Sequence, residues 1–394
     1  MGWLSAEAAL ALLGTKPQTL YANVSRGRIA ARPDPEDSRR SLYKQDDVER
    51  LAGRQRGRRP AQAVAAETIA WGEPVLETAI STVAGGRLFY RGQDAAALAE
   101  HAGLEAVAAL LWASGSGGGF GASSPPPGLP LEGGGVGPVR FGGHEGLSQV
   151  YVDMAMLAAT DMPTAGRTRA VLLRDAERVV GTVANALAGP GEQALHERLA
   201  QRWARPEAAD VIRRALVLLA EHELNASTFA ARVTASTGAP LSAAVLAGLA
   251  ALSGPLHGNA SQSMAGLLEQ AGRLGVEAAL AAHLRQGQAL PCFGHRLYPD
   301  GDIRARTLMA AFEVPAVFAQ LAEAGEGLSG ERPNVDFALM AMSAAFDLPR
   351  DAPLQIFALG RSVGWIAHAL EQVETGTLIR PRARYVGNPH PASP

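Results

Sequence analysis

From Leu147 to Gln372 the chain places apolar residues at helical spacing, and glycine or proline interrupts the pattern at intervals. Such a segment predicts a series of helices that pack on one another through their apolar faces. Aromatic residues make up only 5% of the 394 residues, which favours helices over β-sheet. The longest apolar runs, around 216–220 and 243–252, are far shorter than the ~20 residues of a membrane-spanning helix. We therefore expect a mainly α-helical protein with a large core and no membrane association.

The cysteine content and the first residues indicate the compartment. Cys292 is the single cysteine, so an internal disulfide and a cysteine-rich metal site are excluded. The N-terminal residues lack the basic and apolar regions of a signal peptide. We expect a cytoplasmic protein. Cys292 itself is expected to be buried and inert, because no motif around it explains how its thiol would be activated.

The net charge of −2 conceals an uneven distribution. Residues 1–60 hold 12 Lys or Arg against 7 Asp or Glu, a net of +5, and the rest of the chain has a net of −7. A basic N-terminal segment on an acidic body indicates two modules with different partners. The basic side chains expected to meet phosphates, if this segment binds DNA, are Lys16, Arg26, Arg28, Arg39 and Arg40.

The N-terminal segment has the order helix, tight turn, helix, wing and helix. Residues 4–13 predict the first helix, with Ser5 as its N-cap. Pro17 fits the first turn of a second helix. Residues 29–30 and 41–43 flank a polar tip and predict a short hairpin. A third helix is expected to begin at the next acidic pair, which suits the positive end of a helix.

These elements resemble the N-terminal DNA-reading module of MerR-type regulators and excisionases. The motifs that support the resemblance are Leu-Ser-x-x-x-Ala, Leu-Gly-x-x-x-x-Thr-Leu-Tyr and a later Asp-Val. The resemblance implies a winged helix-turn-helix domain over residues 1–53. A basic linker over residues 54–66 is expected to follow it.

Residues 114–146 form a low-complexity stretch with runs of three glycines and three prolines. Such a composition cannot bury enough apolar surface to offset the entropy lost on ordering, so we expect a mobile surface loop. A phosphate-binding role is disfavoured, because the stretch has no Gly-Lys-Ser/Thr and no strand precedes it.

Four acid–base residues lie next to expected helix boundaries. His222 follows an apolar helix over 212–221. His257 stands in Gly-Pro-Leu-His-Gly-Asn, before a helix whose positive end would keep the ring neutral and able to donate a hydrogen bond. His295 stands in Phe-Gly-His-Arg-Leu-Tyr. Asp336 follows Arg-Pro-Asn-Val, again before a helix.

Each of these residues also has an ordinary structural interpretation. A histidine beside glycine is more often a satisfied polar residue than a catalyst, and an aspartate before a helix is usually an N-cap. The segment at His222 reads His-Glu-x-Asn rather than His-Glu-x-x-His, so it is not a zinc protease motif. Taken one by one, these residues leave the function open.

Taken together, the segments match a known family in order and spacing. The most specific motifs are Gly-Pro-Leu-His-Gly, Gly-His-Arg-x-Tyr followed by Asp-x-Arg-Ala, and Pro-Asn-Val-Asp-Phe. Supporting motifs are Thr-Ala-Ile-Ser with Tyr-Arg-Gly, His-Glu-x-Asn-Ala-Ser-Thr-Phe, and a terminal Ile-Arg-Pro followed by Tyr-Val-Gly. On these motifs the chain from about Glu67 to Gly387 resembles the citrate synthase family.

The resemblance implies a two-lobed, all-helical body over residues 67–387, with a smaller lobe over approximately 227–333 and a short tail at 388–394. It implies an acyltransferase of the tricarboxylic acid cycle that condenses acetyl-CoA with oxaloacetate and hydrolyses the citryl thioester. No metal, cofactor or prosthetic group is implied beyond the CoA thioester as co-substrate. A homodimer is implied, because in the family the last active-site arginine reaches across from the partner subunit.

The resemblance also implies roles for individual residues. By family position Asp336 is the base that removes the methyl proton, His257 stabilises the enolate, and His295 polarises and protonates the oxaloacetate ketone. A dianionic substrate needs cations matched to carboxylates, which suits guanidinium groups. The residues at the family's oxaloacetate-binding positions are His222, Arg304, Arg361 and Arg380.

One departure from the family concerns CoA. Pro299 stands where the family usually has a lysine or arginine near the CoA phosphates, and Asp300 follows it. This change should weaken CoA binding unless Arg296 or Arg306 compensates, and Arg296 is the residue we expect to contact CoA. The proposed acid–base set is otherwise complete, so a pseudoenzyme is disfavoured.

Alternative functions remain open at this point. A 2-methylcitrate synthase would use propionyl-CoA, and one methylene changes binding by only ~1–3 kcal/mol, which sequence motifs do not report. A DNA-binding regulator would use the synthase body as a ligand sensor. The N-terminal module could instead be a cap that stabilises a dimer.

Overall fold

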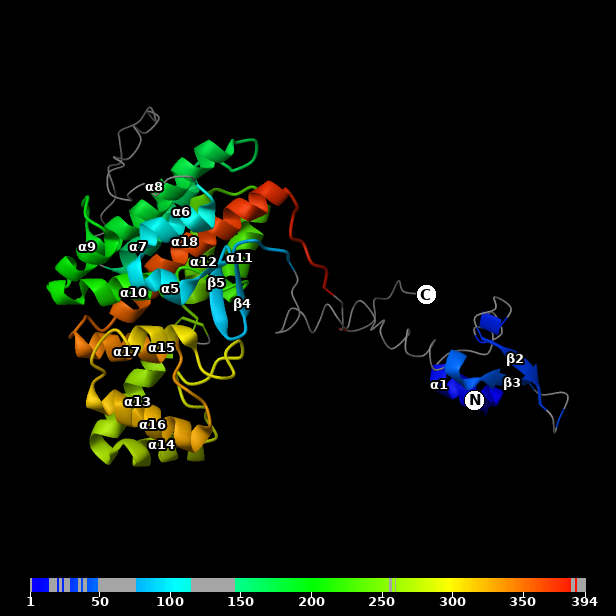
Figure 1. Ribbon diagram of the computed structural model, residues 1–394. Helices are drawn as coiled ribbons and strands as arrows, with labels where there is room; N and C mark the ends of the chain where they lie inside the picture. The colour runs from blue at the N-terminus through cyan, green and yellow to red at the C-terminus, as the bar shows by residue number, and fades with distance from the viewer. Residues whose placement is uncertain are drawn as a thin grey trace. The chain divides into compact units, whose positions relative to one another are not determined.

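The computed structural model describes residues 2–13, 20, 23–24, 29–34, 37, 41–48, 76–114, 146–254, 257–258, 260–383 and 387 (Figure 1). The chain separates into two compact units, Met1–Glu77 and Thr78–Pro394. Several predicted features lie outside the described residues. These are the linker at 54–66, residues 115–145 of the low-complexity stretch, the tail at 388–394, and the basic residues Lys16, Arg26, Arg28, Arg39 and Arg40.

The first unit combines a short helix with a small antiparallel sheet. Helix α1 (Ala6–Leu13) begins after Ser5, whose Oγ accepts a hydrogen bond from the Ala8 amide at 3.2 Å. The sheet has the order β1 (Trp3–Leu4), β3 (Ser41–Lys44), β2 (Ala31–Pro33). The predicted helix, its serine cap and the hairpin are confirmed, with the first hairpin strand two residues later than expected. This unit has its own buried core, formed by Ala9, Leu20, Ile29, Tyr43 and Val48.

The second unit opens with a small sheet that the sequence indicated only in part. Its strands are β4 (Ser81–Ala84), β5 (Arg87–Tyr90) and β6 (Gln93–Asp94), all antiparallel. The predicted extended piece is β5. Gly85 and Gly86, both with positive φ (57° and 72°), make the tight turn between β4 and β5, as two-residue hairpin turns require.

The rest of the described second unit is mainly helical, as predicted. Its helices are α5 (Ala95–His101), α6 (Leu104–Trp112), α7 (Leu147–Thr160), α8 (Arg169–Ala188), α9 (Leu195–Arg202), α10 (Ala209–Leu219), α11 (Ala226–Ser236), α12 (Leu241–Leu252), α13 (Ala260–Leu274), α14 (Val276–Arg285), α15 (Ile303–Met309), α16 (Ala316–Ser329), α17 (Val335–Ala345) and α18 (Ala352–Thr375), with a 3-10 turn at Pro206–Ala208. None of the described helices is long and apolar enough to cross a membrane.

Helix α18 runs through the centre of the larger core, against α6, α8, α10, α11, α12 and α17 (Figure 1). Most of its residues are buried, because it is apolar on nearly all sides. Glycine residues at the contacts let the neighbouring helices pack close to α18. A Cβ on Gly248 of α12 would lie 2.6 Å from the Trp365 ring, and one on Gly360 would lie 3.0 Å from the Leu216 carbonyl oxygen. The backbone of α10 therefore lies directly against the segment of α18 that holds Arg361.

A second, smaller core lies among α13, α14, α16 and α17. Helix α17 belongs to both cores, since Phe337 and Ala341 face the smaller one while Ala338 and Met342 face the larger one. Figure 1 shows α15 and α17 between the two groups of helices.

The start of the smaller lobe differs from the predicted position. Helices α11 and α12 fall within the predicted range 227–333, yet they pack on α7 and α18 and contribute to the larger core. The smaller core begins at Met264. Helical periodicity shows which face of α12 is buried but not which core buries it, so the sequence placed this boundary too early.

Candidate active site

His222 lies just after α10, in a short segment that turns sharply. The next residue, Glu223, has a φ of 51°, a conformation that few side chains adopt. The turn buries the His222 ring to 6% exposure and brings Nε2 to 3.0 Å from the hydroxyl of Tyr298. The ring also lies edge-on to His295, with 4.9 Å between ring centroids. Two predicted site residues that are 73 positions apart in sequence thus share one contact.

His295 is held by its own local turn. The Leu297 amide donates a hydrogen bond to His295 Nδ1 at 3.2 Å, so the proton of the neutral ring is on Nε2. Burial lowers the pKa of His295 to about 4, with help from the Arg304 guanidinium and opposition from Asp302. The ring is therefore neutral at pH 7, with Nε2–H free to donate.

His257 precedes α13, as predicted, and contacts the start of α11. Its Nε2 lies 2.8 Å from the Ser227 hydroxyl, which also accepts a hydrogen bond from Trp365 Nε1 at 3.1 Å. The same hydroxyl lies 2.8 Å from Asn225 Oδ1, the N-cap of α11. Burial and then the Arg361 charge lower the pKa of His257 to about 4.

All three histidine rings are neutral at pH 7, because their pKa values are lowered. The pKa of His222 is lowered well below its usual value by burial first and then by Arg304, His295 and Arg361. Each ring has one nitrogen tied to the protein and one with no partner among the described residues. Neutral imidazoles with a free nitrogen can act as hydrogen-bond donors to a ligand oxygen.

Asp336 stands in the first turn of α17. The N-cap of that helix is Asn334, whose Oδ1 accepts a hydrogen bond from the Asp336 amide at 3.0 Å. The aspartate is therefore not a cap, which was its ordinary structural interpretation. Burial raises the pKa of Asp336 to about 6, against the lowering influence of Arg304 and Arg361. A carboxyl group with a pKa near neutrality suits a general base.

Arg304 is buried and held by Asp302. Its Nε and Nη2 donate to the two carboxylate oxygens of Asp302 at 3.0 and 2.8 Å, and both side chains are at most 3% exposed. Asp302 also caps α15 and accepts a hydrogen bond from the Val335 amide of α17 at 3.1 Å. The pair keeps the guanidinium charged, because the pKa of Arg304 is raised by Asp302 although burial opposes this.

Arg361 is the most unusual cation of the group. It is 1% exposed, and its Nε donates to the Leu219 carbonyl oxygen at 2.8 Å. Its Nη2 is buried and has no hydrogen-bond partner in the described part of the chain. Burial lowers the pKa of Arg361, and the nearby Glu221 carboxylate opposes that shift. A buried donor without a partner costs roughly 1–3 kcal/mol, and a ligand acceptor bonded to this nitrogen would offset that cost.

Two predicted residues lie outside this cluster. Arg380 is exposed in the segment after α18, and Arg296 is exposed at the surface beside His295. Neither is among the charges that shift the pKa of His222 or Asp336. Conversely, the cluster includes Tyr298 and Ser227, to which the sequence analysis gave no role. Their signal was present, because both stand inside the quoted family motifs.

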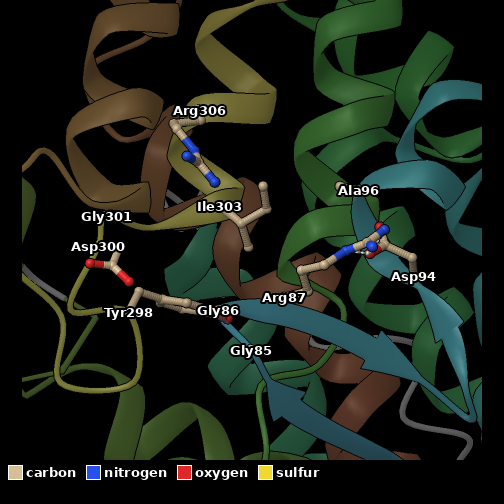
Figure 2. A pocket seen from close by; sticks show the side chains of 10 residues that line it. All are labelled: Gly85, Gly86, Arg87, Asp94, Ala96, Tyr298, Asp300, Gly301, Ile303 and Arg306. Atoms are coloured by element: carbon tan, nitrogen blue, oxygen red, sulfur yellow. Dashed lines mark hydrogen bonds and ion pairs between the residues drawn. The ribbon is translucent and has the colours of Figure 1, made fainter.

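A cavity of about 480 Å³ adjoins the cluster (Figure 2). Its walls come from the β4–β5 turn, the start of α5, and the segment from Tyr298 into α15. Figure 2 shows Arg87 paired with Asp94 on one side, at 2.7 Å, and Arg306 on another. Arg306 has no ion pair with any residue that the structure describes. Tyr298 lines this cavity, and its hydroxyl contacts His222.

Metal ions and thiol chemistry find no support in the described part of the chain. No group of three or more His, Cys, Asp or Glu within it could hold a metal ion. Cys292 is buried, and burial followed by the charge of Asp336 raises the pKa of its thiol well above the usual value. This agrees with the expectation of a buried, inert cysteine.

Comparison with solved structures supports the fold. A citrate synthase from Thermotoga maritima is 27% identical, with a TM-score of 0.60 over 80% of this chain and 94% of that one. A citrate synthase from Thermoplasma acidophilum, in a ternary complex with carboxymethyl coenzyme A and oxaloacetate, has a TM-score of 0.65 at 24% identity, over 83% and 97%. At that identity the second likeness concerns the fold alone.

Comparison with sequences identifies the family. The model for the C-terminal domain of citrate synthase matches residues 153–382, more than half of the chain. A protein named putative citrate synthase 2, from Mycobacterium bovis, is 34% identical over 79% of this chain and 89% of its own length. A 2-methylcitrate synthase 1 from Corynebacterium glutamicum is 34% identical over 45% and 51%. On these matches, with the histidines, arginines and aspartate gathered as described, the chain belongs to the citrate synthase family of acyltransferases.

Proposed function

We propose that this protein condenses acetyl-CoA with oxaloacetate and hydrolyses the resulting thioester to citrate and CoA. The observation that supports this most directly is the buried Nη2 of Arg361, which has no hydrogen-bond partner among the described residues. Around it lie a second buried guanidinium, neutral histidines and a carboxyl group with a raised pKa. This set fits an anionic ketone substrate together with a weak carbon acid.

Oxaloacetate would be held by the two buried guanidinium groups. Arg304 and Arg361 supply positive charge in a region from which water is largely excluded, and guanidinium groups match carboxylates in shape. His222 would add a neutral donor. Because the histidines stay uncharged, the dianion would be balanced by the arginines and would not draw protons onto the imidazole rings.

Carbon–carbon bond formation would need two proton transfers. Asp336 would take a proton from the methyl group of acetyl-CoA while His257 donates a hydrogen bond to the thioester oxygen and stabilises the enolate. The enolate carbon would then attack the ketone carbon of oxaloacetate. His295, with its proton on Nε2, would protonate the ketone oxygen as the bond forms. Water would then cleave the citryl thioester and release CoA.

His257 can act in this way only in one tautomer. Its Nε2 is occupied by Ser227, so the donor to the thioester must be Nδ1–H. In that tautomer the single proton of the Ser227 hydroxyl would turn from Asn225 Oδ1 to His257 Nε2. Asn225 Oδ1 would keep the Thr228 amide as its donor, and the hydroxyl oxygen would still accept from the indole N–H of Trp365.

For the CoA phosphates, the cation missing at Pro299 has a candidate substitute. Arg306 lines the cavity next to Tyr298 and has no ion pair among the described residues. We propose that Arg306, rather than Arg296 alone, meets the phosphates of the thioester.

We also propose a cytoplasmic homodimer. What supports the dimer is the position of Arg380, which is exposed and apart from the cluster in a single chain. Met156 and Met162, 47% and 64% exposed near the end of α7, offer apolar surface to a second copy. Arg380 of one copy would then complete the oxaloacetate site of the other.

The direct test is release of CoA thiol, measured with acetyl-CoA and with propionyl-CoA in the presence of oxaloacetate. We expect turnover with acetyl-CoA to exceed that with propionyl-CoA. Asp336→Asn should lower turnover by about 10²–10⁴-fold, because an amide cannot accept the methyl proton. Oxaloacetate binding, measured by calorimetry, should be largely retained.

The matched control is Asp347→Asn, since that side chain is 88% exposed. It should leave turnover unchanged. Near-normal turnover in Asp336→Asn would show that the base is another residue. Faster turnover with propionyl-CoA would instead favour a 2-methylcitrate synthase.

The pH dependence follows from the same carboxyl group. Asp336 must be ionised to act as a base, and its pKa in the free protein is about 6. Bound oxaloacetate adds negative charge, which raises that pKa further. With oxaloacetate saturating, kcat/KM for acetyl-CoA should therefore fall about tenfold per pH unit below pH 6. In the free protein the pKa values of His257 and His295, about 4, lie below that of Asp336, and the added charge raises all three, so Asp336 is the first of them to be protonated as the pH falls. An acid limb near pH 4 would contradict the assignment.

The first unit favours a second function besides synthesis of citrate. It has its own core and a hairpin, and residues 1–60 have a net charge of +5. We infer that it is a winged helix-turn-helix module that binds duplex DNA.

Removing residues 1–60 should abolish duplex binding and leave thiol release unchanged. Binding by the full chain should weaken steeply with salt, with a slope of about −0.9 per phosphate contact in log K against log salt. Filter binding or fluorescence anisotropy from about 50 to 200 mM salt measures this. If the full chain shows no salt-sensitive duplex binding, the module is better explained as a protein contact or dimer cap.

A further inference from the structure

Tyr298 contacts three of the predicted site residues at once. Its amide donates to the His295 carbonyl oxygen at 2.9 Å, which closes a tight turn and folds the tyrosine ring back towards the histidine, 5.1 Å between ring centroids. The Arg304 guanidinium carbon lies 5.4 Å from the centre of the tyrosine ring. The hydroxyl lies 3.0 Å from His222 Nε2. At 2% exposure the ring is fixed in this position.

The Tyr298 hydroxyl stays protonated and has a single hydrogen-bond acceptor among the described residues. Burial raises the pKa of Tyr298 to about 12, although the Arg304 charge opposes the rise. Among the described residues, the hydroxyl has His222 Nε2 as its single hydrogen-bond partner. If Nε2 carried the ring proton, the hydroxyl proton would be left without an acceptor. The arrangement that uses it has the phenol donating to an unprotonated Nε2.

Donation from the phenol to Nε2 determines which nitrogen of the His222 ring carries the proton. A neutral imidazole has one proton, so an unprotonated Nε2 places the proton on Nδ1. Nδ1 has no partner within the described chain and is not sealed away from solvent. In the opposite tautomer, the nitrogen left for a ligand would present a lone pair, which repels carboxylate and ketone oxygens.

We propose that Tyr298 is a positioning residue whose hydroxyl holds His222 in the Nδ1–H tautomer, so that the ring presents a donor to oxaloacetate. The identity of the ligand rests on the proposed function. The tautomer itself is a property of the ligand-free protein, so the tautomer assignment and the proposed function can be refuted independently.

The first experiment reads the tautomer directly. In protein with ¹⁵N-labelled histidine and no ligand, the His222 signals are identified by their loss in His222→Asn. We expect a protonated Nδ1 and an unprotonated Nε2 in the wild type. Tyr298→Phe removes the donor and should give a ring with the proton on Nε2 in at least part of the molecules.

The matched control is Tyr90→Phe. Tyr90 is equally buried, but its hydroxyl contacts the backbone oxygens of Val217, Leu218 and Glu221 rather than a histidine. This variant should lower the midpoint of thermal unfolding and leave the His222 tautomer unchanged. A wild-type ring with its proton on Nε2 would overturn the proposal, whether or not any variant folds.

The second experiment separates binding from chemistry. Tyr298→Phe should raise KM for oxaloacetate about tenfold, the size expected for a misdirected hydrogen bond to a charged group. The kcat and the KM for acetyl-CoA should change less than about twofold, because His257 and Asp336 act on the thioester. An unchanged KM for oxaloacetate with an unchanged tautomer would contradict the proposal. Absence of turnover in the wild type would contradict the proposed function. The role of Tyr298 would then be tested by the tautomer measurement, which needs no substrate.

Discussion

The burial of Arg361 inside helix α18 is the constraint on which the rest of the site depends. The helix is buried on nearly all sides, and Gly360 and Gly364 remove the side chains that would keep α10 at a distance. That closeness lets the Leu219 carbonyl oxygen accept from Arg361 Nε and brings Glu221 near enough to support the charge. Among the described residues, Nη2 of this guanidinium still lacks an acceptor. The packing of the larger core thus prepares a position that a carboxylate can complete.

The other charges of the site follow from that arrangement. Two buried arginines and low exposure together keep the three histidines neutral, and burial alone would also protonate Asp336 at a higher pH than usual. The cations favour the ionised carboxylate, so its pKa settles at about 6. Under the proposed function, one set of residues would supply positive charge for substrate binding, neutral donors for developing oxyanions and a base that works near neutral pH. Asp302 holds Arg304 in this cluster through an ion pair. The same carboxylate accepts a hydrogen bond from the Val335 amide and so links α15 to α17.

The sequence predicted most of the helices and the family, but not the contacts between distant residues. Helical spacing and glycine or proline breaks indicated most helices, and the family resemblance named His222, Arg304 and Arg361, which the structure places in buried positions. The contact between Tyr298 and His222 joins residues 76 positions apart, and no local pattern reports such a pairing. The lobe boundary was placed too early, because periodicity does not say which of two cores buries α12. A single chain does not show the contact expected of Arg380, because that contact is made with the oxaloacetate site of a second copy.

The most direct test of the account is the affinity of Arg361→Leu for oxaloacetate, measured by calorimetry beside its thermal unfolding. Leucine fills apolar space and removes the buried donor without a partner, so the variant should stay folded. It should lose about 2–5 kcal/mol of oxaloacetate binding, roughly 30- to 5,000-fold in Kd. Arg232→Leu is the control, because Arg232 is equally buried but bonded to Glu371 and Gln372; it should lower stability and spare the affinity of the folded protein. Wild-type affinity in Arg361→Leu would contradict the account.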